Sequence, residues 1–277
     1  MSKAKITFIG GGNMATSLIA GLVADGYALH DIRVVEPNPE RRNALQARYG
    51  VRAFAEGAEA LADADTLVLC VKPQVAREVC TGIAPALPAR APLVVSVMAG
   101  VPERTLQGWL GSRLPIVRAM PNTPAMVQTG AIGLHASPEV DAEGRNRAET
   151  ILRAAGLIRW VEDEGKIDAV TAISGSGPAY FFLFMEAMED AGVALGLDPQ
   201  TARLLTIQTA LGAAKMAMES DAPPSRLREQ VTSPGGTTER ALAVFADADL
   251  RGLVARATAA ARDRATELSQ TLSLEAP

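Results

Sequence analysis

The sequence predicts an α/β protein in which a doubly wound parallel sheet is followed by an all-helical part. Short β-branched runs alternate with amphipathic helical runs up to about residue 162. Beyond that point strand patterns stop, and helical stretches rich in Ala, Leu, Met and Gln follow one another. A glycine-rich turn also joins the first expected strand to the first expected helix. We therefore expect two domains, over residues 1–162 and 163–277.

The expected strands of the first domain are short apolar runs that come at regular intervals. Thr66–Val71 is continuously apolar, as expected of a strand that is buried on both faces. The complete set is Lys5–Ile9, Ile32–Glu36, Thr66–Val71, Leu93–Val97 and Ile116–Met120, with later candidates at Ala131–Leu134 and Ile158–Val161.

Start and stop signals frame the expected helices. Asn13–Asp25 ends before Gly26, and the next helix has Asn38 as its N-cap, Pro39 at its first position and Gly50 as its stop. In the second domain we expect helices over residues 166–173, 178–195, 199–219, 225–231, 237–246 and 250–271.

Composition excludes several classes of function. The chain has 27 basic and 31 acidic residues, well mixed, so a nucleic-acid-binding face is not expected. Two His and two Cys leave little material for a metal centre or a histidine-based triad, so we expect no metal. The longest apolar stretch is too short to span a bilayer, and no targeting segment is evident. We expect no membrane association and a cytoplasmic location.

The turn Gly10-Gly11-Gly12-Asn13-Met14-Ala15 fits the G-x-G-x-x-A pattern of dinucleotide-binding Rossmann domains. It follows a strand and opens a helix, as that function requires. Gly10 permits the tight turn, Gly12 lets a pyrophosphate approach the backbone, and Ala15 allows close packing of helix on sheet. The alternative is an ordinary glycine-rich turn between strand and helix.

The end of the second strand bears on the choice of cofactor. Glu36 lies about 20 residues beyond Ala15, where an acidic residue can bind the adenosine ribose and favour NAD. Arg41 and Arg42 follow, and arginine suits the 2′-phosphate of NADP, although both could simply lie on a solvated helix face. Asn38 could serve either cofactor. NADP(H) is our preferred expectation, and NAD(H) stays open.

Other segments follow the carboxyl ends of the expected strands, where ligands of doubly wound sheets bind. Val71-Lys72-Pro73 is one, and Lys72 there could orient a substrate or a nicotinamide, or be a surface lysine. The others are Met98-Ala99-Gly100 and the segment 120–125.

Two loops of the helical part combine glycines, hydroxyls and the starts of helices. They are Ser174-Gly175-Ser176-Gly177-Pro178-Ala179 and Ser233-Pro234-Gly235-Gly236-Thr237-Thr238. Each could hold a small carboxylate or phosphate, or be only a capped helix start. Their pairing with a dinucleotide domain favours a site for a small anionic molecule.

These motifs resemble, in order and spacing, those of the Δ1-pyrroline-5-carboxylate reductase family. The matching segments are IGGGNM, VKP, RAMPNTPA, AISGSGPAYFF, GAAKM and VTSPGGTT, and the resemblance covers residues 5–272. It implies NAD(P)H-dependent reduction of L-1-pyrroline-5-carboxylate to L-proline, the last step of proline biosynthesis. It also implies a Rossmann domain followed by a helical dimerisation domain, the layout of 6-phosphogluconate dehydrogenases. Homodimers, or assemblies of dimers up to decamers, are expected, with substrate sites shared between subunits.

The resemblance also implies site residues. Thr238 would hydrogen-bond the ring nitrogen as the catalytic hydroxyl. The remaining substrate-binding residues would be Glu164, Ser176, Gly177, Ser233, Gly236 and Thr237. The cofactor-binding residues would be Gly10, Gly11, Gly12, Asn13, Met14, Glu36, Asn38, Arg41, Val71, Lys72, Pro73 and Ala99. Family members often carry a small hydroxyl residue in place of Glu36, and its carboxylate would repel a 2′-phosphate unless Arg41 or Arg42 compensates.

Two other functions fit the layout. A β-hydroxyacid dehydrogenase would need a catalytic lysine in the helical part, where only Lys166 and Lys215 occur. A non-catalytic dinucleotide-binding protein is also possible, because an Ala-rich helical half can serve mainly as an oligomer interface.

Overall fold

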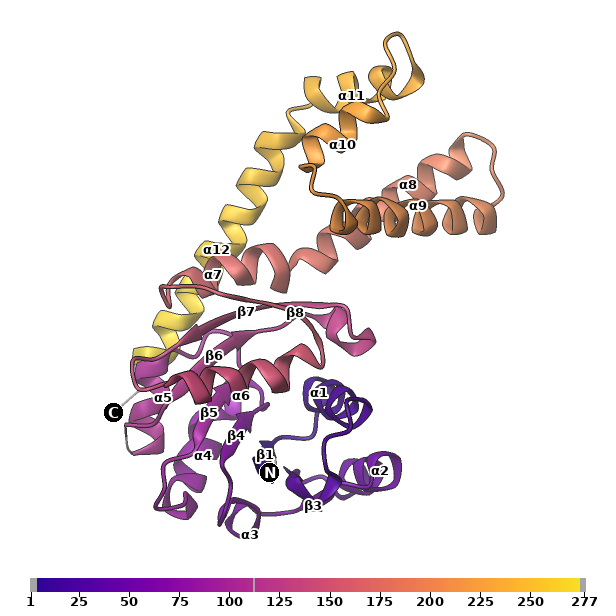
Figure 1. The fold of residues 1–277 in the computed structure, drawn as a ribbon. Coiled ribbons are helices and arrows are strands. Elements are labelled where there is room, and N and C mark those ends of the chain that lie inside the picture. Colours follow the sequence, from indigo (N-terminus) through magenta and orange to yellow (C-terminus); the bar gives the residue numbers. More distant parts are fainter. Residues whose placement is uncertain (1–3, 112, 275–277) are drawn as a thin grey trace. The chain divides into compact units, whose positions relative to one another are not determined.

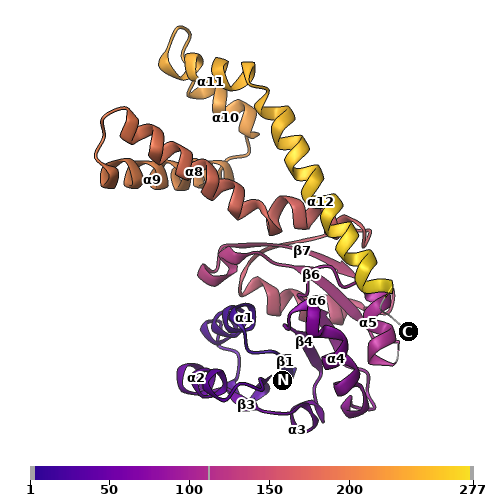
Figure 2. The same cartoon turned by 180° about the vertical axis from the view of Figure 1, so that it is seen from behind.

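The computed structural model of the chain describes residues 4–111 and 113–274 (Figures 1 and 2). It divides into two compact units. The first runs to Ser176 and resumes at Ala261, and the second extends from Gly177 to Ala260. None of the described helices is long and apolar enough to cross a membrane.

Within the described residues of the first unit, eight strands form one sheet in the order β3-β2-β1-β4-β5-β6-β7-β8. They are β1 Ile6–Ile9, β2 Ile32–Val35, β3 Arg52–Phe54, β4 Thr66–Leu69, β5 Leu93–Ser96, β6 Ile116–Met120, β7 Gly130–Ala136 and β8 Gly156–Trp160. All neighbours pair in parallel except β6 and β7, which are antiparallel. The doubly wound α/β fold is confirmed.

Two features of the sheet differ from the sequence-based expectation. Strand β3 was not predicted, because three residues are too few to show a period. Strand β7 runs against β6, because only the short segment 121–129 joins them and a parallel crossover needs a dozen residues or more.

Helices cover both faces of this sheet. They are α1 Asn13–Ala24, α2 Pro39–Tyr49, α3 Gly57–Leu61, α4 Pro73–Ile83, α5 Glu103–Leu110, α6 Ala142–Arg153 and α7 Lys166–Val170. Adjacent residues of β4 point to opposite faces: Val68 belongs to one hydrophobic cluster, Leu67 and Leu69 to the other. All three are fully buried, which explains the unbroken apolar run.

The predicted helix caps are present in α2. The Asn38 side chain accepts a hydrogen bond from the Arg41 N–H over 2.9 Å, and Pro39 is the first helical residue. Gly50 ends the helix at φ +70°, in the left-handed region that glycine adopts most easily.

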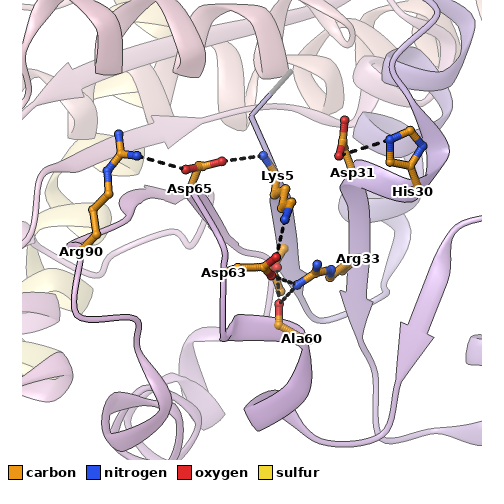
Figure 3. Close-up of polar contacts among 9 residues, drawn as sticks. Lys5, His30, Asp31, Arg33, Ala60, Asp63, Asp65 and Arg90 are labelled. Atoms are coloured by element: carbon orange, nitrogen blue, oxygen red, sulfur yellow. Dashed lines mark hydrogen bonds and ion pairs between the residues drawn. The ribbon is translucent and has the colours of Figure 1, made fainter. Parts of the chain in front are cut away.

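Polar contacts at the amino-terminal edge of the sheet hold β1, β2 and β4 together (Figure 3). The Lys5 N–H donates to Asp65 Oδ2 over 2.9 Å, just before β1 and β4 begin. Hydrogen bonds from the Arg33 and Lys5 side chains hold the pKa of the Asp63 carboxyl well below its usual range. Ligands of parallel sheets bind at the other edge, so this cluster is structural.

The first unit does not end at residue 162, where the composition changes, because α7 packs on the sheet. Ile167 is buried, and a Cβ at Gly133 would lie 2.5 Å from a Val170 methyl group. The end of α12 (Leu250–Leu274) also belongs to this unit, and Thr266 Oγ1 donates to Asp168 Oδ2 over 2.8 Å. The change in composition at residue 162 marks where strands give way to helices, but it does not show which of these helices pack on the sheet.

The second unit consists of α8 Gly177–Ala194, α9 Pro199–Glu219, α10 Pro224–Gln230, α11 Thr237–Asp247 and the start of α12. All of its residues are described, and only Gly177, Ala202 and Thr206 among them are buried. Large apolar side chains such as Phe181 (68% exposed) and Met218 (74%) face outward. Apolar surface on this scale marks an interaction surface.

Candidate cofactor and substrate site

A cavity of about 660 Å³ opens at the carboxyl ends of β1, β4 and β5. This volume suits a cofactor-sized ligand. Nine of the twelve predicted cofactor-binding residues line it: Gly11, Gly12, Asn13, Met14, Arg41, Val71, Lys72, Pro73 and Ala99. Gly10, Glu36 and Asn38 are not part of the lining.

The three glycines of the first turn have different surroundings. Gly10 has φ +94°, and a Cβ there would lie 2.9 Å from the Cys70 carbonyl oxygen. A Cβ at Gly11 would lie 2.7 Å from Leu45 Cδ1. A Cβ at Gly12, the N-cap of α1, would meet nothing within 4 Å. Gly10 and Gly11 thus serve close packing, whereas Gly12 leaves open space at a helix N-terminus, where a pyrophosphate would fit.

The Glu36 carboxylate holds this turn by hydrogen bonds on the side away from the cavity. It is 5% exposed, and its two oxygens accept hydrogen bonds from the Gly11 N–H and the Asn38 N–H, each over 2.9 Å. Asn38 in turn caps α2. Both residues therefore shape the cavity without lining it.

Three cations face the cavity: Arg41, Arg48 and Lys72. Across residues 4–111 and 113–274, none of them forms an ion pair, and the Arg48 guanidinium lies 5.1 Å from the Tyr49 ring centre. Arg42 instead donates to the carbonyls of Glu36 and Pro37, over 2.8 and 2.7 Å. The free cations favour an anionic ligand.

Arg48 and Tyr49 were missed in the sequence analysis. They lie seven and eight residues beyond Arg41, so α2 presents all three on one face. That spacing was the signal that could have identified them.

Glu164 lies in a partly buried polar cluster of the first unit, outside the lining of the cavity. Its Oε1 accepts hydrogen bonds from Arg118 Nη1 over 2.6 Å and from the Glu103 N–H over 2.8 Å. His135, opposite Arg118 on β7, has its Nδ1 2.6 Å from Glu103 Oε1. Burial raises the pKa of the Glu103 carboxyl. This cluster could not be predicted from the sequence, because it depends on the antiparallel register of β6 and β7.

We expect Glu164→Gln to lower the free energy of unfolding by about 3 kcal/mol, because it leaves the buried Arg118 guanidinium without the negative charge of its ion-pair partner. The Arg118 side chain is 6% exposed. Urea unfolding of the variant measures the loss. The matched control is Glu219→Gln, which removes an exposed ion pair with Lys215 and should cost less than about 1 kcal/mol. Equal stabilities of the two variants would contradict this role of Glu164.

The predicted substrate loop of the second unit precedes α11. Gly236 is the N-cap of this helix, Gly235 has φ +72°, and the Gly235 N–H donates to Glu239 Oε2 over 2.7 Å. Within the described residues, the side chains of Ser233, Thr237 and Thr238 have no hydrogen-bond partner. Their hydroxyls are available to a ligand.

The structure also locates the other predicted substrate-binding residues and the lysine that a hydroxyacid dehydrogenase would need. Ser176 ends the first unit and Gly177 begins the second. Lys215, the lysine of α9, lies 3.8 Å from Glu219 in an exposed ion pair, which favours a structural role. In the described part of the chain, no three His, Cys, Asp or Glu side chains gather as metal ligands do.

Comparison with known proteins decides the family. The model for "pyrroline-5-carboxylate reductase dimerisation" matches residues 164–268, and that for "NADP oxidoreductase coenzyme F420-dependent" matches residues 5–100. The pyrroline-5-carboxylate reductase of Pseudomonas aeruginosa is 50% identical over 98% of this chain and 99% of its own. This chain belongs to the pyrroline-5-carboxylate reductase family.

Solved structures agree with this assignment. A pyrroline-5-carboxylate reductase from Coxiella burnetii is 45% identical with a TM-score of 0.93, and covers 96% of this chain and 98% of its own. The Plasmodium falciparum enzyme, solved with NADP bound, is 29% identical with a TM-score of 0.84 over 97% of this chain and 99% of its own. The resemblance stated from the sequence motifs is confirmed.

Proposed function

We propose that the protein reduces L-1-pyrroline-5-carboxylate to L-proline with NAD(P)H, the final step of proline biosynthesis. The observation that carries the proposal is the 50% identity to a pyrroline-5-carboxylate reductase over nearly the whole chain. The free cations and the open space at Gly12 support it, because they suit a dinucleotide phosphate.

The first unit would bind the cofactor. When bound, the reduced nicotinamide supplies the hydride that the reaction needs. Gly12 and the start of α1 would hold the pyrophosphate, and Arg41 would hold the adenosine end. Val71 and Ala99 follow β4 and β5 at the carboxyl edge and would flank the nicotinamide.

The second unit would supply the substrate-binding groups. Ser233 and the backbone from Gly236 to Thr238 would bind the carboxylate at the start of α11. Hydride adds to C5 of the imine, whose protonated nitrogen takes the π electrons and becomes a secondary amine. The Thr238 hydroxyl would accept a hydrogen bond from that N–H or relay the proton to the imine nitrogen, with water as the alternative donor. No strong base is required.

A steady-state assay tests this function directly. We expect pyrroline-5-carboxylate to trigger oxidation of NADPH or NADH, with L-proline as the product. Tight cofactor binding without this oxidation would favour a non-catalytic dinucleotide-binding protein. Oxidation of hydroxyacids with NAD, and no imine reduction, would favour a hydroxyacid dehydrogenase.

NADPH is the cofactor that we propose, because Arg41 faces the cavity without an ion-pair partner in the described chain and Glu36 is held by backbone N–H groups. We expect Arg41→Ala to lower kcat/KM for NADPH about tenfold, since one charge-assisted contact to the 2′-phosphate is lost. The value for NADH, which lacks this phosphate, should change less than about twofold.

Arg42→Ala is the matched control for this variant. The Arg42 guanidinium binds the carbonyls of Glu36 and Pro37, so its loss should affect both cofactors alike. If Arg41→Ala lowered kcat/KM for NADH and for NADPH equally, the proposed contact of Arg41 with the 2′-phosphate would be wrong.

The chain carries its family's dimerisation domain, and the exposed apolar residues of the second unit suit such an interface. Further association of dimers, up to a decamer, belongs to the proposal, and light scattering after gel filtration measures it. The cytoplasmic location expected from the sequence is also part of the proposal.

A further inference from the structure

Pro178, in the first turn of α8, removes one backbone donor just beyond the π-helix that continues α7. Helix α7 continues as a π-helix over Thr171–Gly175, where the Ser176 N–H donates to the Thr171 carbonyl over 2.8 Å. In an α-helix, the Ser174 carbonyl would accept from the N–H of residue 178. That residue is Pro178, which has no N–H. The Ser174 carbonyl therefore lacks its α-helical donor.

Asn122 supplies a donor instead. Its Nδ2 donates to the Ser174 carbonyl over 3.0 Å, and its Oδ1 accepts from the Ala131 N–H over 3.0 Å. Its own carbonyl accepts from the Ala125 N–H over 3.1 Å. Asn122 is 9% exposed, so water competes little for these bonds. One amide thus ties the π-helix to the first residues of β7.

The π-helix also packs closely against β6. A Cβ at Gly175 would lie 2.6 Å from Met120 Cε, at the end of that strand. Ala172 is buried here as well. The segment 171–176 is therefore held at the carboxyl end of β6, the strand next to β5, which Ala99 follows. This is the edge of the sheet where the cofactor cavity opens.

The Ser176 hydroxyl has no hydrogen-bond partner among the residues that the structure describes, and it lies two residues beyond the carbonyl that Asn122 holds. We infer that Asn122 is a positioning residue for the reduction: its amide fixes the segment 171–176 so that Ser176 meets the substrate. The inference rests on the proposed function. Asn122 itself need not touch the substrate.

The test variant is Asn122→Asp, which keeps an acceptor for the Ala131 N–H but turns a carboxylate toward the Ser174 carbonyl. We expect kcat/KM for pyrroline-5-carboxylate to fall by about 10²-fold, as when a binding group is displaced by about 1 Å. The Kd for NADPH, measured by fluorescence titration, should stay within about twofold of the wild type, because the cofactor cavity does not involve this segment.

Gln107→Glu is the matched control. The Gln107 amide also makes two hydrogen bonds to the backbone, both to Leu114 and both over 2.8 Å, but Gln107 does not line the cavity. We expect a similar fall in melting temperature and unchanged kinetics. Equal kinetic losses in both variants, or a loss of NADPH binding in Asn122→Asp, would overturn the inference. So would an unchanged kcat/KM in Asn122→Asp.

Asn122→Ala covers the case in which Asn122→Asp does not fold. It removes the hydrogen bond to the Ser174 carbonyl without burying a charge, so a selective loss in kcat/KM for pyrroline-5-carboxylate is again expected. An unchanged value would overturn the inference. An inactive wild type that binds NADPH would instead overturn the proposed function, and this inference with it.

Discussion

Replacing Thr238 with alanine is expected to lower kcat for the reduction of pyrroline-5-carboxylate by about 10²-fold, within the range for general acid–base help. The Thr238 hydroxyl lies in the first turn of α11 and has no internal hydrogen bond within the described chain. Its removal should leave the fold intact and deprive the ring nitrogen of its hydrogen-bond partner. Steady-state kinetics at saturating NADPH measure the effect.

Two variants make this result specific. Thr238→Ser keeps the hydroxyl and should retain most of kcat. Thr232→Ala is the matched control, because the Thr232 hydroxyl already donates to the Arg228 carbonyl over 2.7 Å and is not free for a ligand. An unchanged kcat in a folded Thr238→Ala variant would remove Thr238 from the mechanism.

The second large effect is expected at Gly12. Gly12→Val should raise the KM for NADPH by about 10²-fold, equivalent to losing one or two hydrogen bonds to a charged group. The reason is steric, because the new side chain would occupy the space that a pyrophosphate needs. The free protein should lose no more than about 1 kcal/mol of stability, because valine is a poorer N-cap than glycine but a Cβ at Gly12 meets nothing within 4 Å.

Gly82→Val is the control for Gly12→Val. Gly82 also has nothing within 4 Å of an added Cβ, but it lies in α4 and does not line the cavity. Both variants should melt near the wild-type temperature, and only Gly12→Val should lose cofactor affinity. If Gly12→Val kept its KM for NADPH, the proposed pyrophosphate site would be wrong.

The sequence predicted those parts of the fold that local chemistry determines. The cap at Asn38, the left-handed stop at Gly50 and the buried strand β4 all follow from nearby residues. The bounds of α9 were predicted to the residue, because Pro199 begins a helix and the Ala- and Leu-rich run sustains it. Long-range pairing was less accessible, so β3 and the direction of β7 were missed.

The candidate site also has parts that could be predicted from the sequence and parts that could not. The glycine turn and the ends of β4 and β5 could be predicted, because a parallel sheet brings the carboxyl ends of its strands to one edge. The hydrogen bonds of Glu36 to the Gly11 and Asn38 N–H groups could not be predicted, because they depend on how the loop folds back. The tie between Asn122 and Ser174 joins segments 52 residues apart and appears only in the folded chain.

Deuterium transfer tests the central claim most directly. The protein is incubated with pyrroline-5-carboxylate and NADPH that carries deuterium at nicotinamide C4, on the face from which hydride leaves, and the product is analysed by mass spectrometry and NMR. The account predicts L-proline with a single deuterium at C5. Proline without deuterium, or no proline despite bound cofactor, would contradict it.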